Sequence, residues 1–310
     1  MRILLLLLVF SCSALQAGQL ELSAENHSQL LAEYIYFLED PEAGLHIHDV
    51  ENLPDTAWQH NSAQAFNHGY NSSTWWLKLV IHNQEEAPLK RLLEISYPVL
   101  DYISAYIYTD KGVQELHLGD KLPFSERPID HRNFVIPLEW EANETLTLYL
   151  SVKSSSSIQV PLTLWQEQSF FNFDRTQTLI HGIYYGIMFV MVMYNLFVYL
   201  AVGERNYLYY VLFVCCMPLF LASLSGFAFQ YLWPEFTQWN DQAILVTLSA
   251  SIVFGLLFTH HFLNARELRN FNRFAAYILA CGASLIIILA FTLPYNIVIR
   301  ILIPFAAVTC

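Results

Sequence analysis

The chain has 310 residues, of which 55% are hydrophobic and only 14% are charged, and its mean hydropathy is +0.35. This composition is too apolar for a single water-soluble globule, so part of the chain must lie in lipid. The charge is unevenly spread, because 23 of the 27 acidic residues but only 8 of the 15 basic residues fall between Gly18 and Asp174. Such an acidic segment offers too few basic side chains to hold a phosphate backbone, which excludes nucleic-acid binding.

Residues 1–17 have the layout of a secretory signal peptide. A basic residue precedes a short apolar run, 3–10, and small or polar residues follow it. The run is too short to span a bilayer, so we expect the segment to be removed on export, by cleavage after Ala17 or Ala14. Cys12 leaves a lipoprotein-type signal as the alternative. The exported half contains no other cysteine, so it cannot use disulfides.

The segment from Trp75 to Trp165 has the period of β-strands. Short runs rich in aromatic and β-branched residues are separated by turns that contain Gly, Asn, Asp or Pro. The predicted strands are 75–82, 91–95, 102–108, 134–138, 146–152 and 159–165. Their regular spacing, without alternating helices, predicts an all-β sandwich or jelly roll, which we place at residues 18–170. Apolar residues at helical spacing over 28–40 predict one short helix before these strands.

After Asp174 the pattern changes to apolar stretches long enough to cross a membrane. The predicted spans are about 179–201, 207–224, 243–263 and 274–293. A further stretch begins near Asn296 and reaches Cys310, which is shorter than a span, so we expect the native product to be longer. Residues 179–310 are therefore expected to form an α-helical transmembrane bundle, with four complete helices and part of a fifth.

The loops between the spans agree with export of the N-terminal half. Loops 202–206 and 264–273 together contain four arginines, whereas loops 225–242 and 292–296 contain no lysine or arginine. Basic loops stay in the cytoplasm, so the acidic domain must lie on the other side of the membrane. We expect a multi-pass protein of a bacterial inner (cytoplasmic) membrane with its N-terminal domain in the periplasm.

A sugar-binding site needs aromatic faces for stacking and polar side chains for hydroxyl groups. The exported half supplies both types in Trp58, Tyr70, Trp75, Trp76, Arg127, His131 and Arg132. Trp75 and Trp76 are neighbours on a strand and point to opposite faces, so at least one of them is expected in the core. Arg127 and Arg132 have a simpler alternative, which is to pair with the surrounding carboxylates.

Polar side chains in the membrane half are candidates for a functional role, because hydrocarbon is a costly environment for them. The candidates are Asn195, His260 and His261. The two histidines lie near a span end where they can reach water, and Asn195 can form a hydrogen bond between helices. The chain shows no Gly-rich phosphate loop and no convincing set of metal ligands, so we expect no catalytic residue, cofactor or metal in it.

Several local strings, in this order along the chain, resemble the bacterial seven-transmembrane receptors with diverse intracellular signalling modules (7TMR-DISM). In the exported half the strings are Asn67-His68-Gly69, Trp75-Trp76-Leu77-Lys78, Leu93-Glu94-Ile95-Ser96-Tyr97-Pro98, Gly119-Asp120, Arg127-Pro128 and His131-Arg132-Asn133-Phe134. In the membrane half they are Tyr184-Tyr185-Gly186, Tyr194-Asn195-Leu196-Phe197, Tyr207-Leu208-Tyr209-Tyr210, Gly226 and Gln230-Tyr231-Leu232-Trp233-Pro234. The first set resembles the type 2 extracellular domain of that family, and the whole resemblance covers about residues 30–310.

The resemblance implies a jelly-roll sensor domain similar to carbohydrate-binding modules, seven helices, and a cytoplasmic output domain such as a diguanylate cyclase (GGDEF) or a histidine kinase. We therefore expect a receptor that lies in the lipid bilayer and binds a small extracytoplasmic ligand. A carbohydrate ligand and a homodimer are left open. The alternative is a membrane-anchored scaffold that binds envelope glycans or a protein partner without signalling. The junction from Trp165 to Thr178 is too short to act as a slack tether, and we expect its phenylalanines to pack between domain and membrane.

Overall fold

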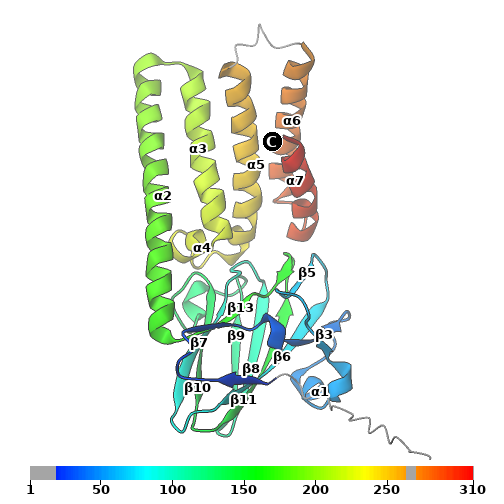
Figure 1. Ribbon diagram of the computed structural model, residues 1–310. Helices are drawn as coiled ribbons and strands as arrows, with labels where there is room; N and C mark the ends of the chain where they lie inside the picture. Colours follow the sequence, from blue (N-terminus) through cyan, green and yellow to red (C-terminus); the bar gives the residue numbers. More distant parts are fainter. Residues whose placement is uncertain (1–18, 263–269, 310) are drawn as a thin grey trace, which may run out of the picture.

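The computed structural model of the chain describes residues 19–262 and 270–309. The predicted signal peptide, residues 1–17, lies outside the described residues. The described chain forms two parts, an N-terminal β domain and a set of helices that stands on one end of it (Figure 1). The expected fold class, an all-β sandwich followed by apolar helices, is confirmed.

Two sheets pack face to face in the β domain. Among the described residues, the larger sheet has the order β4-β3-β6-β11-β8-β9, with β1 beside β6, and the smaller one has the order β10-β7-β13-β2. The strands of the larger sheet are β1 (Leu20–Leu22), β3 (Tyr36–Asp40), β4 (Gln59–His60), β6 (Thr74–Asn83), β8 (Tyr102–Thr109), β9 (Gly112–Leu118) and β11 (Thr145–Lys153). Those of the smaller sheet are β2 (Ser28–Leu30), β7 (Leu89–Ile95), β10 (Phe134–Trp140) and β13 (Leu162–Trp165), and β5 (Asn67–Gly69) pairs with β12 (Ile158–Gln159).

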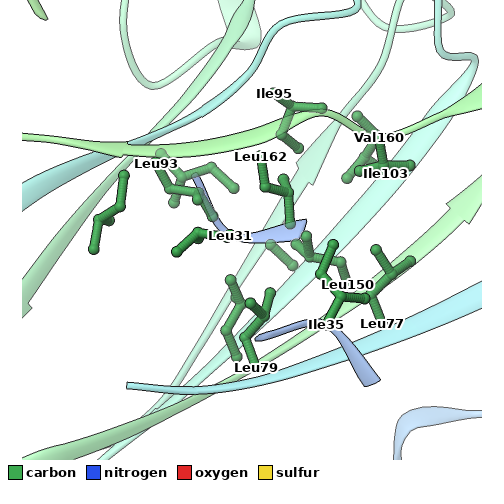
Figure 2. Close-up of a cluster of buried hydrophobic side chains, with 14 of the residues drawn as sticks. Leu31, Ile35, Leu77, Leu79, Leu93, Ile95, Ile103, Leu150, Val160 and Leu162 are labelled. Carbon is green, nitrogen blue, oxygen red and sulfur yellow. The ribbon is translucent and has the colours of Figure 1, made fainter. Parts of the chain in front are cut away.

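The core lies between the two sheets, because alternate residues of each strand point inward. In the larger sheet, Leu77 and Leu79 of β6 and Leu150 of β11 are completely buried. They face Leu93 and Ile95 of β7 in the smaller sheet (Figure 2). Five of the six strands predicted from sequence fall within single strands of the sandwich. The sixth, 159–165, is divided between β12, which pairs with β5, and β13, and the strands β1 to β5 and β9 were not predicted.

Residues 28–40 do not form the expected helix. They form β2, a 3₁₀ turn at Ala32–Tyr34, and β3. β2 pairs with β13, and β3 pairs with β6, so the backbone groups of this segment have partners in both sheets. Leu31 and Ile35 are buried in the core. The helix prediction was wrong because tertiary strand pairing outweighed a weak local preference.

The helices of the second part are α2 (Glu167–Val202), α3 (Arg205–Leu224), α4 (Phe227–Tyr231), α5 (Thr237–Phe262), α6 (Asn270–Leu289) and α7 (Tyr295–Thr309). Among the described residues, α2, α3 and α5 are long and apolar enough to cross a membrane, and the apolar stretches of α6 and α7 are shorter. Helix α3 packs between α2 and α5, and α5 also contacts α6 and α7.

The two ends of the helical part differ. Helix α3 begins at Arg205 at the end away from the β domain, whereas the short helix α4 lies at the end beside it (Figure 1). This arrangement agrees with the arginine-bearing loops being on the side opposite the β domain. Of the predicted cytoplasmic loop 264–273, residues 264–269 lie outside the described chain.

Candidate functional site

A cluster of aromatic side chains covers the outer face of the larger sheet, and we call it the outer aromatic cluster. Its buried members are Val50, Trp58, Trp76 and Tyr149. Among the residues that pack around them are Tyr36, Tyr106 and Tyr108. The ring of Trp58 lies 5.9 Å from that of Tyr149, and the ammonium of Lys78 lies 5.7 Å from the Trp58 ring. The helix α1 (Ile47–Glu51) contributes Val50, so this segment partly covers the cluster.

Two hollows open beside the outer aromatic cluster. One has a volume of about 310 Å³ and is lined by Trp58, Lys78 and Asp55 among others. The other has a volume of about 350 Å³ and is lined by Trp76, Tyr102, Tyr106, Ser104, Ser151 and Lys153 among others. Tyr102 is 52% exposed, whereas Trp58 is only 7% and Trp76 only 3% exposed. The second hollow therefore combines an accessible aromatic ring with hydroxyl and ammonium groups, which suits a small polar ligand.

Trp75 faces the opposite way from Trp76, as the alternation along a strand predicts. It is buried in the core of the sandwich, where its ring stacks on His68 with 3.8 Å between centroids. Its indole N–H donates a hydrogen bond of 3.1 Å to the side-chain oxygen of Asn71. Burial lowers the pKa of His68, so this histidine is neutral against the tryptophan near pH 7.

The other predicted residues lie where the β domain meets the helices, which we call the docking junction. Arg132 donates a hydrogen bond of 2.6 Å from Nη1 to Oδ1 of Asp174 in α2, and Nε2 of His131 lies 3.0 Å from the same oxygen. The backbone N–H of Asn133 donates to Nδ1 of His131 at 3.1 Å. Because Nδ1 accepts this bond, the N–H of His131 is at Nε2, which donates a hydrogen bond to Asp174. Two donors from the β domain therefore hold one carboxylate of α2.

Arg127 is enclosed at the same junction by aromatic rings. Its guanidinium carbon lies 4.5 Å from the ring centres of Phe124 and Phe134 and 5.6 Å from that of Phe229 in α4. Its Nη1 also donates to two backbone carbonyls of its own loop, at 2.8 and 2.7 Å. Burial lowers the pKa of Arg127 to about 10. Arg127 thus stays cationic near pH 7 and contacts α4 through the ring of Phe229.

A chain of polar contacts connects the loop after β9 to the start of α5. Asp120 accepts a hydrogen bond of 3.3 Å at Oδ2 from the side-chain amide of Asn240, and Asn240 accepts one of 3.1 Å from the indole N–H of Trp233. The next residue along, Lys121, forms an ion pair with Asp241 of α5. The carboxyl group of Asp120 is buried, and this burial, together with the charge of Asp241, raises the pKa of Asp120 well above its usual range.

Backbone groups also join the two parts. The N–H of Phe124 donates a hydrogen bond of 2.9 Å to the carbonyl of Pro234, which lies between α4 and α5. Gly226, at the turn from α3 into α4, has a positive φ of 77°. A Cβ atom there would lie 2.8 Å from the carbonyl oxygen of Arg132 and 2.9 Å from Cβ of Pro98. Only glycine permits this close approach of the helical turn to the β domain.

Tyr70 makes a third contact between the two parts, on the side of α7. Its carbonyl accepts a hydrogen bond of 3.0 Å from Arg300, whose guanidinium lies 5.8 Å from the Tyr70 ring. The ring also packs against the apolar cluster formed by α5, α6 and α7. The β domain therefore contacts α2, the region of α4 and α5, and α7.

The structure does not gather the predicted ligand-binding residues into one site. Trp58 and Trp76 lie on the outer face of the larger sheet and Trp75 lies in the core. The remaining four lie at the docking junction, where each contacts a helix. They are Tyr70, Arg127, His131 and Arg132. A ligand role for each stays a prediction, but the arginines do have the carboxylate or aromatic partners of the simpler alternative.

The polar candidates in the helices contact their own surroundings. The side-chain amide of Asn195 donates to the carbonyl of Met191 in the same helix at 2.8 Å, so no bond to another described helix is seen. His261 likewise donates to a carbonyl of its own helix at 2.9 Å. The ring of His260 lies 4.8 Å from that of Tyr277 in α6, which places it at a helix–helix contact.

Sequence reasoning missed the charged and amide groups of the docking junction that link the two parts. They are Asp120, Lys121, Asp174, Asn240 and Asp241. One local signal pointed to Asp241. The loop 225–242 contains only two charged residues, and Asp241 stands two residues before the start of the predicted span 243–263. An isolated charge at that position calls for a partner.

Two family models match the chain. The model described as 7TMR-DISM extracellular 2 matches residues 32–166, and the model described as 7TM diverse intracellular signalling matches residues 177–310. A search of curated proteins found no match to this chain. The first match ends one residue after β13, and the second begins within α2, so the docking junction joins the two matched regions.

Proposed function

The chain belongs to the bacterial seven-transmembrane receptors with diverse intracellular signalling modules, the 7TMR-DISM family, and we propose that its β domain senses a small extracytoplasmic ligand on behalf of the helices. The observation that carries this proposal is the docking junction, which gives the β domain contacts with α2, α5 and α7. A ligand that binds one arrangement of these contacts more tightly than another shifts the population of the whole molecule.

The connection between sensor and helices supports direct coupling. Strand β13 ends at Trp165 and α2 begins at Glu167, so a single residue separates them. Phe170, in the first turns of α2, is only 1% exposed and packs against Leu92 and Val135 of the smaller sheet. Because α2 is part of the sandwich's own packing at this point, a movement of the sandwich moves α2 as well.

We place the ligand in the hollow beside Trp76 and Tyr102. Its lining pairs an exposed ring with hydroxyl groups, the combination by which proteins hold sugars, so a glycan fragment is the ligand class that we propose. The hollow also borders the strands β6, β8 and β11, whose inner faces form the core. A ligand there would act on the sandwich without competing with the helices at the docking junction.

The proposed organisation in the cell follows from the charge pattern. Residues 1–17 would direct export, residues 18–170 would form a periplasmic sensor, and residues 179–310 would lie in the inner membrane. The acidic character of the first half and the arginines of the loops on the far side support this orientation. The signal would pass to a cytoplasmic output module of the kind that the family name describes.

A thermal-shift screen tests the ligand proposal. The full chain, reconstituted in lipid nanodiscs, would be heated with envelope glycan fragments, oligosaccharides and small metabolites. We expect saturable stabilisation by one chemical class, lost in Tyr102→Ala and kept in Val113→Ala, which removes a similarly exposed side chain on β9. Stabilisation that survives Tyr102→Ala would move the site elsewhere, and silence of every compound would remove the small-ligand proposal.

Insertion of a flexible Gly-Ser linker between Gln166 and Glu167 tests the coupling. We expect the β domain to keep its ligand response while the helices lose theirs, read as ligand-dependent amide exchange in α3 and α5. A matched insertion of the same linker between Lys111 and Gly112, in the hairpin of β8 and β9, should leave both responses intact. If the helices still respond after the junction insertion, rigid coupling is wrong. A response confined to the β domain even in the unaltered chain would favour a binding scaffold.

A further inference from the structure

Asp120 is an unusual buried acid at the docking junction. Its side chain is 2% exposed, and of its two carboxyl oxygens only Oδ2 has a hydrogen-bond donor, the amide of Asn240 at 3.3 Å. Oδ1 is buried without any hydrogen-bond partner. An ionised carboxylate spreads its charge over both oxygens, so leaving one of them dry and unpaired is costly, whereas a neutral carboxyl group fits this environment far better.

The titratable groups around Asp120 come from every element packed on it. They are Asp101 before β8, Lys121 beside it, Arg127 before β10, Asp241 in α5, and the phenols of Tyr97 and of Tyr295 in α7. Asp101 and Asp241 disfavour a further negative charge, whereas Lys121 and Arg127 favour one. With Asp120 neutral, the three aspartates and two cations carry no net charge, and with Asp120 ionised they carry one excess negative charge in a buried space.

Lys121 does not cancel that charge, because it is already engaged. Its ammonium forms the ion pair with Asp241, and the two side chains are 20% and 18% exposed. Burial disfavours the charged form of Lys121, but its ion pair with Asp241 favours it, so Lys121 stays cationic. The pair is partly exposed, so solvent reaches the side chains that adjoin the buried carboxyl group. Protons can therefore exchange between Asp120 and the extracytoplasmic solution.

We propose that the docking junction senses extracytoplasmic protons: Asp120 is protonated when the loop after β9 is docked on α5, and loss of that proton loosens the contact. This inference rests on the proposed function, because it makes the proton a second input to the same coupling between sensor and helices. The ligand class is the proton itself, and the binding group is the carboxyl of Asp120 with its unpaired oxygen Oδ1.

The direction of the effect follows from linkage. The docked state raises the pKa of Asp120 above the value of 3.8 that a solvated aspartic acid has. Docking is therefore strongest below that ordinary value, weakens as pH rises towards the docked pKa, and levels off above it. For each unit by which the two pKa values differ, the docking equilibrium changes by about tenfold over this window.

Amide hydrogen exchange of the full chain in phosphatidylcholine nanodiscs tests the proposal without any ligand or output module. Exchange in segments 117–128 and 233–243 would be followed between about pH 4 and about pH 8, after correction for the intrinsic pH dependence of exchange. We expect the corrected protection of both segments to fall on going to the higher pH, by about tenfold for each unit of pKa difference. Asp120→Asn, which is neutral at every pH, should keep both segments protected throughout.

Asp130→Asn is the matched control, because Asp130 is an exposed acid of the same junction that accepts a hydrogen bond of 3.0 Å from Gln230. It should keep the pH dependence of the unaltered chain. Constant protection of the unaltered chain across the range would overturn the proposal whatever the variants do. Unchanged pH dependence in Asp120→Asn would overturn it as well. Neither result bears on ligand binding in the outer hollow, so failure of this inference is distinguishable from failure of the proposed receptor function.

Discussion

Arg132 and Asp174 lie 2.6 Å apart, nitrogen to oxygen, and they connect the loop before β10 to the helix that follows β13. The two side chains are 10% and 23% exposed, so solvent screens their attraction only in part. The pair therefore fixes the angle at which α2 leaves the sandwich, in addition to the covalent connection itself.

Asp174→Asn should weaken the docking of α2 by about 1.5–3 kcal/mol, because it removes a charge-assisted bond while leaving Arg132 partly buried. A double-mutant cycle with Arg132→Gln, read by the thermal stability of the full chain, would measure the coupling between the two groups. Glu167→Gln, an exposed acid at the start of the same helix, is the control and should have little effect. Additive effects of the two variants would show that the pair does not act as a unit.

Gly226→Ala should destabilise the contact between α4 and the β domain. Gly203 has the same positive φ of 77°, but a Cβ atom there meets nothing within 4 Å. Gly203→Ala therefore pays only the backbone penalty of about 1–2 kcal/mol, whereas Gly226→Ala adds a clash with the backbone at Arg132. The comparison of their unfolding temperatures isolates the close approach. Equal losses would mean that the turn moves away at no further cost.

Gly119→Ala should displace the loop that carries Asp120. A Cβ atom at this position would lie 1.9 Å from the carbonyl oxygen of Asp101, a distance that no side chain tolerates. We expect faster amide exchange at 119–121 and in the first turns of α5, since the contact with Asn240 is lost. Gly112→Ala, also at a positive φ but in open space, should leave this exchange unchanged. Normal exchange in Gly119→Ala would show that the loop adapts.

Leu79→Ala should destabilise the β domain by about 3 kcal/mol, because it leaves a cavity at a completely buried position between the sheets. Val113→Ala, at a position that is 56% exposed, should change stability by no more than about 0.5 kcal/mol. Urea unfolding of the full chain, followed by the fluorescence of the buried tryptophans, measures both. A small loss in Leu79→Ala would mean that the sandwich collapses into the vacated space.

The sequence predicted the sandwich and the spans well, because both depend on local periodicity. The alternation at Trp75 and Trp76 identified two faces of one strand. Each apolar stretch coincides with a helix, although the stretch 274–293 extends four residues beyond the end of α6 at Leu289. The helix predicted for 28–40 was wrong because Leu31 and Ile35 are held by pairing with distant strands. The early start of α2 also escaped prediction, since the segment from Glu167 to Asp174 mixes polar residues with phenylalanines and does not continue the apolar stretch.

The docking junction was beyond sequence reasoning for a different reason. Asp120 and Asn240 are 120 residues apart, and no period or spacing connects them. Their contact exists only because the helices pack on one end of the sandwich in one orientation. The four predicted residues at the junction were chosen for sugar chemistry, and the same features, flat rings and multiple donors, turn out to suit contact with helices.

The unbroken run of α2 has a mechanical consequence. With 36 residues, the helix is roughly 54 Å long and extends from the side of the sandwich to the far end of the helical part. It acts as a lever arm whose short end is clamped by Phe170 and Asp174. From Asp174 to Val202 the free arm is roughly 42 Å long, so a tilt of about 5° at the clamp moves its far end through roughly 4 Å, somewhat less than the pitch of one helical turn. Under the proposed function, a shift that hardly disturbs the sandwich would be magnified by this arm into a much larger displacement at the end of α2 away from the β domain.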